Sequence, residues 1–135
     1  MLTRIDIETP AGESLIDITS QVTQVFAEGS IQEGIAVIFV PHSTAALTLN
    51  SGIDPNTAQD IIDDFRRLVP IRLDFHHIYD TPADAAGHIK SVLVGNSLTL
   101  IVSKGKLLLG SSQNILFFEF DGPRRRQVWI RTIAD

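Results

Sequence analysis

Asp84 and His88 stand four positions apart in a segment whose apolar pattern is that of a helix. Residues at this spacing share one helix face, so the carboxylate can contact the imidazole. A carboxylate in that position holds the ring in one tautomer, whether the ring binds a metal or moves a proton. The alternative is an ordinary ion pair on an exposed helix face. The spacing therefore makes both residues candidates for catalysis.

The other three histidines lie outside this helix. His42 follows the apolar segment 35–40, where a buried strand would open into a loop, a common place for functional groups. The alternative is a histidine that fills a strand end and bonds a carbonyl group. His76 and His77 are adjacent, so their side chains diverge and at most one faces a site. The spacing of the histidines matches no metal-binding motif, but three imidazoles from separate segments would suit an open zinc site.

Cationic side chains near these histidines could bind an anion. At about 100° per residue, the apolar stripe of the helix is centred near Ile89, with His88 and Lys90 at opposite edges. Lys90 would then serve a different part of the site, or extend its amine along the surface to solvent. Residues 124–126 are three arginines, which either clamp a phosphate or point alternately to the two faces of a hairpin. Both interpretations remain open for each of these cations.

The composition limits the class of protein. The chain has 135 residues, of which 44% are hydrophobic and 20% charged, as expected for one folded domain over residues 1–135. It contains no cysteine, which excludes disulfides, thiolate nucleophiles, iron–sulfur clusters and cysteine-ligated zinc. A net charge of −5 argues against a nucleic-acid partner. Without a long apolar run or a signal-peptide pattern, we expect a cytoplasmic protein and no membrane partner.

The hydropathy pattern predicts an α+β fold, with a layered, β-sandwich-like mixed sheet of about eight strands and two main helices. The first helix begins at Asp54-Pro55 and ends before Pro70, and the second runs from about Pro82 to Val94. The buried stripe of the second helix is expected to contain Ala85, Ala86, Ile89, Val92 and Leu93. Strands are expected near residues 2–9, 15–18, 35–40, 45–49, 98–102, 107–109, 115–120 and 128–133. A short helix is expected after Thr19 or Ser20.

A series of motifs in this chain resembles those of the YjbQ-like proteins, in the same order and over nearly the whole length. The segments that carry the resemblance are Pro41-His42-Ser43-Thr44-Ala45-Ala46-Leu47-Thr48-Leu49-Asn50, Asp54-Pro55, Arg67-Leu68-Val69-Pro70, Gly87-His88-Ile89-Lys90-Ser91, Gly95-Asn96-Ser97-Leu98, Leu109-Gly110-Ser111-Ser112-Gln113 and Glu119-Phe120-Asp121-Gly122-Pro123-Arg124. His77 also resembles the family histidine that precedes the second helix, whereas His76 falls where the family varies.

The resemblance implies a thiamine-phosphate synthase-like transferase, which joins a pyrimidine diphosphate to a thiazole phosphate and releases pyrophosphate. It further implies a homotrimer with pockets near its subunit boundaries, a small phosphorylated ligand and a divalent metal (zinc or magnesium), with no organic cofactor. The implied site residues are His42, Asp84, His88 and Lys90 for catalysis, His42, His77 and His88 for the metal, and Lys90 and Arg124 for phosphate.

Three positions depart from the family pattern. Ala83 stands at the acidic position five residues before the histidine of the second helix, and Asp84 follows one residue later. Ser51 stands where the family commonly has glutamate, and Ser112 stands where it has tryptophan. The lost carboxylate and aromatic ring favour an alternative, a non-catalytic trimeric module that binds metal or anions. A third possibility is a metal-assisted hydrolase of a small phosphate ester or amide.

Overall fold

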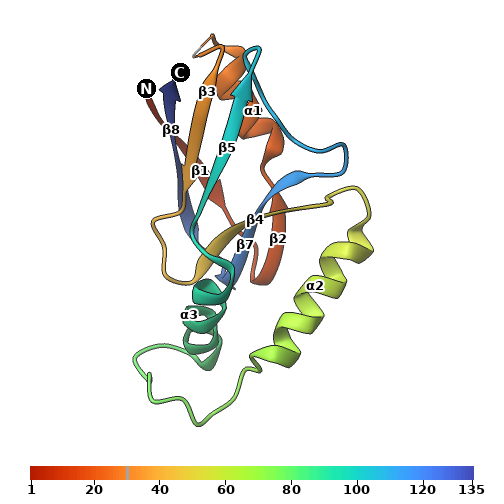
Figure 1. The fold of residues 1–135 in the computed structure, drawn as a ribbon. Coiled ribbons are helices and arrows are strands. Elements are labelled where there is room, and N and C mark those ends of the chain that lie inside the picture. Colours follow the sequence, from red (N-terminus) through yellow and green to blue (C-terminus); the bar gives the residue numbers. More distant parts are fainter. Residues whose placement is uncertain (30) are drawn as a thin grey trace.

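The computed structural model describes residues 1–29 and 31–135, which form two antiparallel β-sheets (Figure 1). The larger sheet has the strand order β1-β8-β3-β5-β6, and the smaller has the order β2-β7-β4. The strands are β1 Leu2–Glu8, β2 Gly12–Asp17, β3 Gly34–Phe39, β4 Ala45–Asn50, β5 Ser97–Ser103, β6 Lys106–Leu107, β7 Asn114–Gly122 and β8 Arg125–Ala134. The α+β fold is confirmed. The pairings within the described residues are all antiparallel rather than mixed, a pattern that needs no long crossover connections.

The described residues contain three helices, α1 Thr19–Ala27, α2 Pro55–Leu68 and α3 Pro82–Val94. Capping residues explain where the two longer helices begin. The Asp54 carboxylate accepts a hydrogen bond from the backbone N–H of Asn56, and the Thr81 hydroxyl accepts one from that of Asp84. A proline follows each cap at the first helical position, where its missing N–H leaves nothing unpaired. Both helices lie where the sequence predicts them.

The main hydrophobic core contains residues of both sheets and of α1. Its fully buried members include Ile38 of β3, Leu47 of β4, Phe117 of β7, Ile130 of β8 and Val22 of α1. β3 lies in the middle of the larger sheet, which agrees with its continuous apolar sequence. This core gives a rigid support to the polar residues at the ends of β4, β7 and β8.

A second, smaller cluster joins α2 to the smaller sheet. Ile62 of α2 is buried in it together with Ala46 and Phe118, and the Phe65 ring meets the edge of the Phe118 ring at a centroid distance of 5.3 Å. α3 packs against β4 and β7, and Figure 1 shows the long 69–81 connection that leads from α2 to it. No helix in the described part of the chain is long and apolar enough to cross a membrane.

The buried face of α3 differs from the expected apolar stripe. Ile89, Val92 and Leu93 are exposed, with 84% of Val92 accessible. The helix instead turns Gly87 and Lys90 toward the protein. A Cβ atom on Gly87 would lie 3.1 Å from Phe120 Cβ, so this glycine allows the helix to approach the sheet closely. Polar contacts made by the neighbouring buried residues therefore outweigh the apolar pattern in orienting the helix.

Candidate metal centre and adjoining cavity

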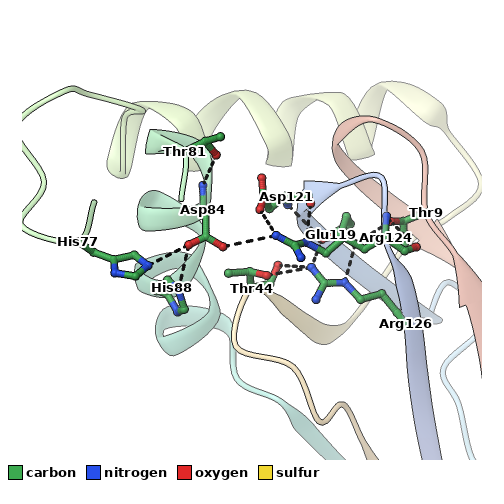
Figure 2. A network of polar contacts seen from close by, with 10 residues as sticks. All are labelled: Thr9, Thr44, His77, Thr81, Asp84, His88, Glu119, Asp121, Arg124 and Arg126. Atoms are coloured by element: carbon green, nitrogen blue, oxygen red, sulfur yellow. Dashed lines mark hydrogen bonds and ion pairs between the residues drawn. The ribbon is translucent and has the colours of Figure 1, made fainter. Parts of the chain in front are cut away.

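Two imidazoles and a carboxylate meet at the N-terminal half of α3 (Figure 2). The Nε2 atoms of His77 and His88 lie 3.1 Å and 3.2 Å from the same Asp84 oxygen, Oδ2. His88 reaches it from one helical turn further along α3, whereas His77 reaches it from the connection before the helix. The Thr81 cap holds the backbone of Asp84 in place. The predicted contact between Asp84 and His88 is present.

The donor atoms and burial of this cluster suit a metal ion. One ligand atom from each of His77, Asp84 and His88 lies within 4.8 Å of the others. Asp84 is 5% exposed, whereas both imidazoles are open to solvent on one side. Two histidines and one carboxylate form a known catalytic zinc ligand set that leaves a coordination position for water or substrate. Without metal, the same carboxylate orients both rings by hydrogen bonding.

Arg124 provides a cation next to the cluster. Its Nη2 atom lies 3.7 Å from Asp84 Oδ1 and 2.7 Å from Asp121 Oδ2. The hydrogen bond that Arg124 donates to the Asp121 carboxylate raises the pKa of the Arg124 guanidinium above its usual value. The side chain remains 41% exposed, so an anion beside the cluster can reach it. The two neighbouring arginines point elsewhere, because Arg125 is exposed and Arg126 is buried, so the hairpin interpretation of the arginine run holds.

Sequence reasoning did not find the buried ion pair between Arg126 and Glu119. Arg126 Nε donates to Glu119 Oε1 at 2.7 Å, and Thr9 Oγ1 donates to the same oxygen at 2.7 Å. Burial raises the pKa of the Glu119 carboxyl, but the hydrogen bonds from Arg126 and Thr9 outweigh this effect and hold it below its usual range. The available signal was an acidic residue inside the apolar strand 115–120, seven positions before an arginine.

The same arginine organises the loop that carries His42. Arg126 Nη2 donates to Thr44 Oγ1 at 2.9 Å, and the next residue, Gln127, donates its backbone N–H to His42 Nε2 at 2.8 Å. Burial, and then the Arg126 charge, lower the pKa of the His42 imidazole. His42 does not belong to the cluster of possible metal ligands formed by the described residues. Of the expected three-histidine set, the structure brings His77 and His88 together with Asp84 and leaves His42 outside the group, with its Nε2 atom accepting a backbone hydrogen bond.

Lys90 is also placed differently from its predicted role. Its Nζ atom lies 2.9 Å from Glu13 Oε2, and the two side chains are 1% and 3% exposed. Arg66 Nε binds the other oxygen of Glu13 at 2.9 Å. In this geometry the Lys90 ammonium is not accessible to a phosphate group, which corrects the predicted phosphate-binding and catalytic role. His88 and Lys90 do point to different sides of α3, as expected.

A cavity of about 790 Å³ adjoins the cluster on its His88 side. Its walls come from the end of β3, the loop after it and the C-terminal half of α3. His42 and His88 both line it, together with Ser91 and Asn96. His88 is thus shared between the cluster and the cavity, which places a hollow large enough for a small molecule next to the possible metal ligands.

Comparison with known proteins agrees with the motifs over the whole chain. The family described as "UPF0047 protein YjbQ-like" matches residues 3–135. The UPF0047 protein MJ1081 of Methanocaldococcus jannaschii is 44% identical over 135 residues, which cover 100% of this chain and 96% of the relative. The UPF0047 protein YugU of Bacillus subtilis is 39% identical over 136 residues, which cover 99% of this chain and 100% of the relative.

Solved structures with the same architecture extend this similarity to the fold. An uncharacterized conserved protein of the YjbQ/UPF0047 family from Clostridium acetobutylicum matches with a TM-score of 0.90 and 37% identity, over 97% of this chain and 99% of that one. A YbjQ-like protein of unknown function from Sulfolobus solfataricus matches with a TM-score of 0.93 and 30% identity, over 100% of this chain and 97% of that one. These descriptions name no substrate.

Proposed function

Because the chain belongs to the YjbQ-like UPF0047 family, we propose that it uses the cluster of His77, Asp84 and His88 as a divalent-metal site for a small phosphorylated molecule. The observation that carries this proposal is the convergence of both imidazoles on one buried carboxylate, with Arg124 on the other oxygen of the same group. Zinc fits this donor set better than magnesium, which prefers oxygen ligands.

Different residues of the proposed site would bind the phosphate, the metal and the organic part of the ligand. Arg124 binds a phosphate oxygen by a charge-assisted hydrogen bond, and its ion pair with Asp121 fixes its position. His77 and His88 hold the metal, and Asp84 neutralises part of its charge. A bound metal supplies Lewis-acid polarisation of a phosphoryl oxygen. The cavity beyond His88 then receives the organic part of the same molecule.

Metal-assisted hydrolysis of a small phosphate ester is the reaction that this geometry supports best. It needs a metal and one cation near the phosphate, and both positions are available around Asp84. The thiamine-phosphate synthase-like transfer that the motifs suggest is the second candidate. A departing pyrophosphate carries more charge than a single phosphate, and burial of Lys90 against Glu13 leaves Arg124 as the one predicted phosphate ligand with an exposed side chain.

The homotrimer expected from the motifs is proposed here as the working assembly. Its support is an apolar patch on the outer face of the larger sheet. Ile35 of β3 lies opposite Ile101 of β5 and Ile133 of β8, and all three side chains are exposed, as is Phe39. Contiguous apolar patches of this kind are typical of interfaces. Light scattering after gel filtration gives the assembly mass directly.

A cytoplasmic location stays a prediction from the sequence.

The reaction is tested by product analysis. The purified protein, freed of metal and then loaded with Zn²⁺ or Mg²⁺, is incubated with 4-nitrophenyl phosphate or with a pyrimidine diphosphate plus a thiazole phosphate. Metal-dependent release of orthophosphate supports hydrolysis, and release of pyrophosphate only from the substrate pair supports transfer. Metal binding without either product contradicts both reactions and supports the non-catalytic module instead.

A further inference from the structure

The hydrogen bond at His42 determines which of its nitrogens carries a proton. The backbone N–H of Gln127 donates to His42 Nε2 at 2.8 Å. A nitrogen that accepts a hydrogen bond has no proton of its own, so the neutral ring carries its proton on Nδ1. Both burial and the nearby Arg126 charge lower the pKa of this imidazole, which agrees with a neutral ring. His42 is therefore a hydrogen-bond donor through Nδ1, while its acceptor atom, Nε2, is already bound to the N–H group of Gln127.

The surrounding contacts keep His42 in this orientation. Thr44, two residues further along, binds the buried Arg126 through its side chain at 2.9 Å, and Arg126 is held by the fully buried Glu119. Gln127 is the next residue after that arginine in β8. The loop is thus linked to the strand that donates to His42 by the Thr44–Arg126 hydrogen bond, and the ion pair with Glu119 fixes Arg126, which restricts rotation of the ring.

The His42 ring lies at the wall of the proposed ligand space. His42 lines the 790 Å³ cavity, and no hydrogen bond joins its Nδ1 atom to any of the described residues. Within the described chain, Ser14 Oγ is the one deeply buried side-chain polar atom that lacks a partner, so the unpaired Nδ1 atom keeps contact with solvent. A rigid donor at a cavity wall is suited to select a ligand that presents an acceptor there.

The walls of the cavity restrict the chemistry of that ligand. Among the described residues, its lining includes Val40, Val92, Ser91 and Asn96, and none of the lining side chains carries a carboxylate, an ammonium or a guanidinium group. Burying a charged group there would lack a compensating partner. The cavity therefore favours an uncharged, partly apolar group, in contrast to the charged surroundings of Arg124.

We propose that His42 is a specificity-determining residue whose Nδ1–H group binds an uncharged acceptor, a carbonyl oxygen or ring nitrogen, on the organic part of the ligand. This assignment rests on the proposed function, because the phosphate of the same ligand lies beside Arg124 and the metal on the other side of His88. Recognition is then divided between two places: the phosphate is bound by charge and metal, and the organic part is selected by a neutral hydrogen bond. His42 takes no part in binding the metal.

The tautomer is measured on the whole protein labelled with ¹⁵N, by long-range ¹H–¹⁵N correlation spectra of its four histidines. We expect a protonated Nδ1 and an unprotonated Nε2 at His42, unchanged when Zn²⁺ is added. A proton on Nε2 overturns the proposal, as does direct coordination of Zn²⁺ by His42. If Zn²⁺ leaves the His77 and His88 signals unchanged, the proposed metal site fails, and the His42 tautomer still decides the present proposal separately.

Binding is measured with 2-pyridone, an uncharged ring with one carbonyl oxygen, in the same spectra. His42→Gln retains an acceptor for the Gln127 N–H but has no donor at the position of Nδ1, whereas His42→Asn retains a donor at that position. We expect 2-pyridone to shift the His42 signals of the native protein. We also expect its affinity to fall about tenfold in His42→Gln and to change less than about threefold in His42→Asn. Equal losses in the two variants, or no shift of the His42 signals, overturn the proposal.

Discussion

The Lys90 ammonium lies 2.9 Å from Glu13 Oε2, and neither side chain is more than 3% exposed. Arg66 binds the second oxygen of the same carboxylate. The three residues belong to α3, β2 and α2, so one buried carboxylate connects three elements that are distant in sequence. This arrangement explains why Lys90 faces the interior of the protein and not the cluster of His77, Asp84 and His88.

Removing Lys90 alone is predicted to destabilise the fold. In Lys90→Met, Glu13 stays buried with one partner fewer, and breaking a buried ion pair in this way costs about 3–5 kcal/mol of unfolding free energy. Urea denaturation measures this loss. The double variant Lys90→Met/Glu13→Leu removes both charges and is expected to recover most of the stability while phosphate affinity stays unchanged. A loss of phosphate affinity in the double variant would show that Lys90 does reach the ligand.

Arg124 is predicted to bind phosphate, and Arg125 provides a matched control because it is an adjacent arginine with an exposed side chain. Removing a charge-assisted hydrogen bond in Arg124→Gln is expected to weaken binding of inorganic phosphate by about tenfold. Arg125→Gln is expected to leave it unchanged. Calorimetric titration of each metal-loaded variant with phosphate makes the comparison. Equal weakening in both variants would mean that the effect is one of net charge only.

Acid is predicted to destabilise the protein partly through Glu119. The pKa of this carboxyl is lowered in the folded state, so the unfolded chain takes up the proton first as the pH falls. Its contribution is therefore present above the ordinary pKa of 4.5 and is lost as the pH falls below that value through the folded pKa. Urea denaturation of wild type and Glu119→Gln from pH 7 to pH 3 should show a stability difference that shrinks below pH 4.5. A difference that stays constant over this range contradicts the assignment.

The sequence predicts the parts of this fold that depend on local rules. Asp54-Pro55 and Pro82 mark helix starts because caps and proline act within one helical turn. The Asp84–His88 contact follows in the same way from helical spacing. The position of His77 depends on the course of the 69–81 connection, which no periodicity defines. The motif resemblance marks His77 as a candidate ligand but does not place it beside Asp84.

Contacts between distant residues could not be read from the pattern. Lys90 is buried because Glu13, 77 positions earlier, lies beside it. The apolar pattern of α3 contains no information about this partner in β2. For the same reason the apolar stripe predicts a buried Ile89, whereas this side chain lies on the surface. The resemblance places His42 among the metal ligands, but the strand that occupies its Nε2 atom begins 83 positions later, at Arg125.

A substitution at His88 is predicted to affect catalysis without affecting the assembly. Its Nε2 atom contacts Asp84, and its ring lines the cavity, yet it is half exposed and contributes little to the core. His88→Ala is expected to abolish turnover while the mass of the assembly, measured by light scattering, stays the same. Unchanged activity in this variant would remove His88 from the proposed site.

Zinc stoichiometry tests the central claim most directly, and His76 offers a matched control because it is exposed and adjacent to His77. Calorimetric titration of the metal-free protein with Zn²⁺ is expected to give one site per chain. We expect that site to persist in His76→Ala and to be lost, or weakened by about 100-fold, in His77→Ala and His88→Ala. Absence of saturable zinc binding in the native protein, or an equal loss in His76→Ala, would contradict a metal site at His77, Asp84 and His88.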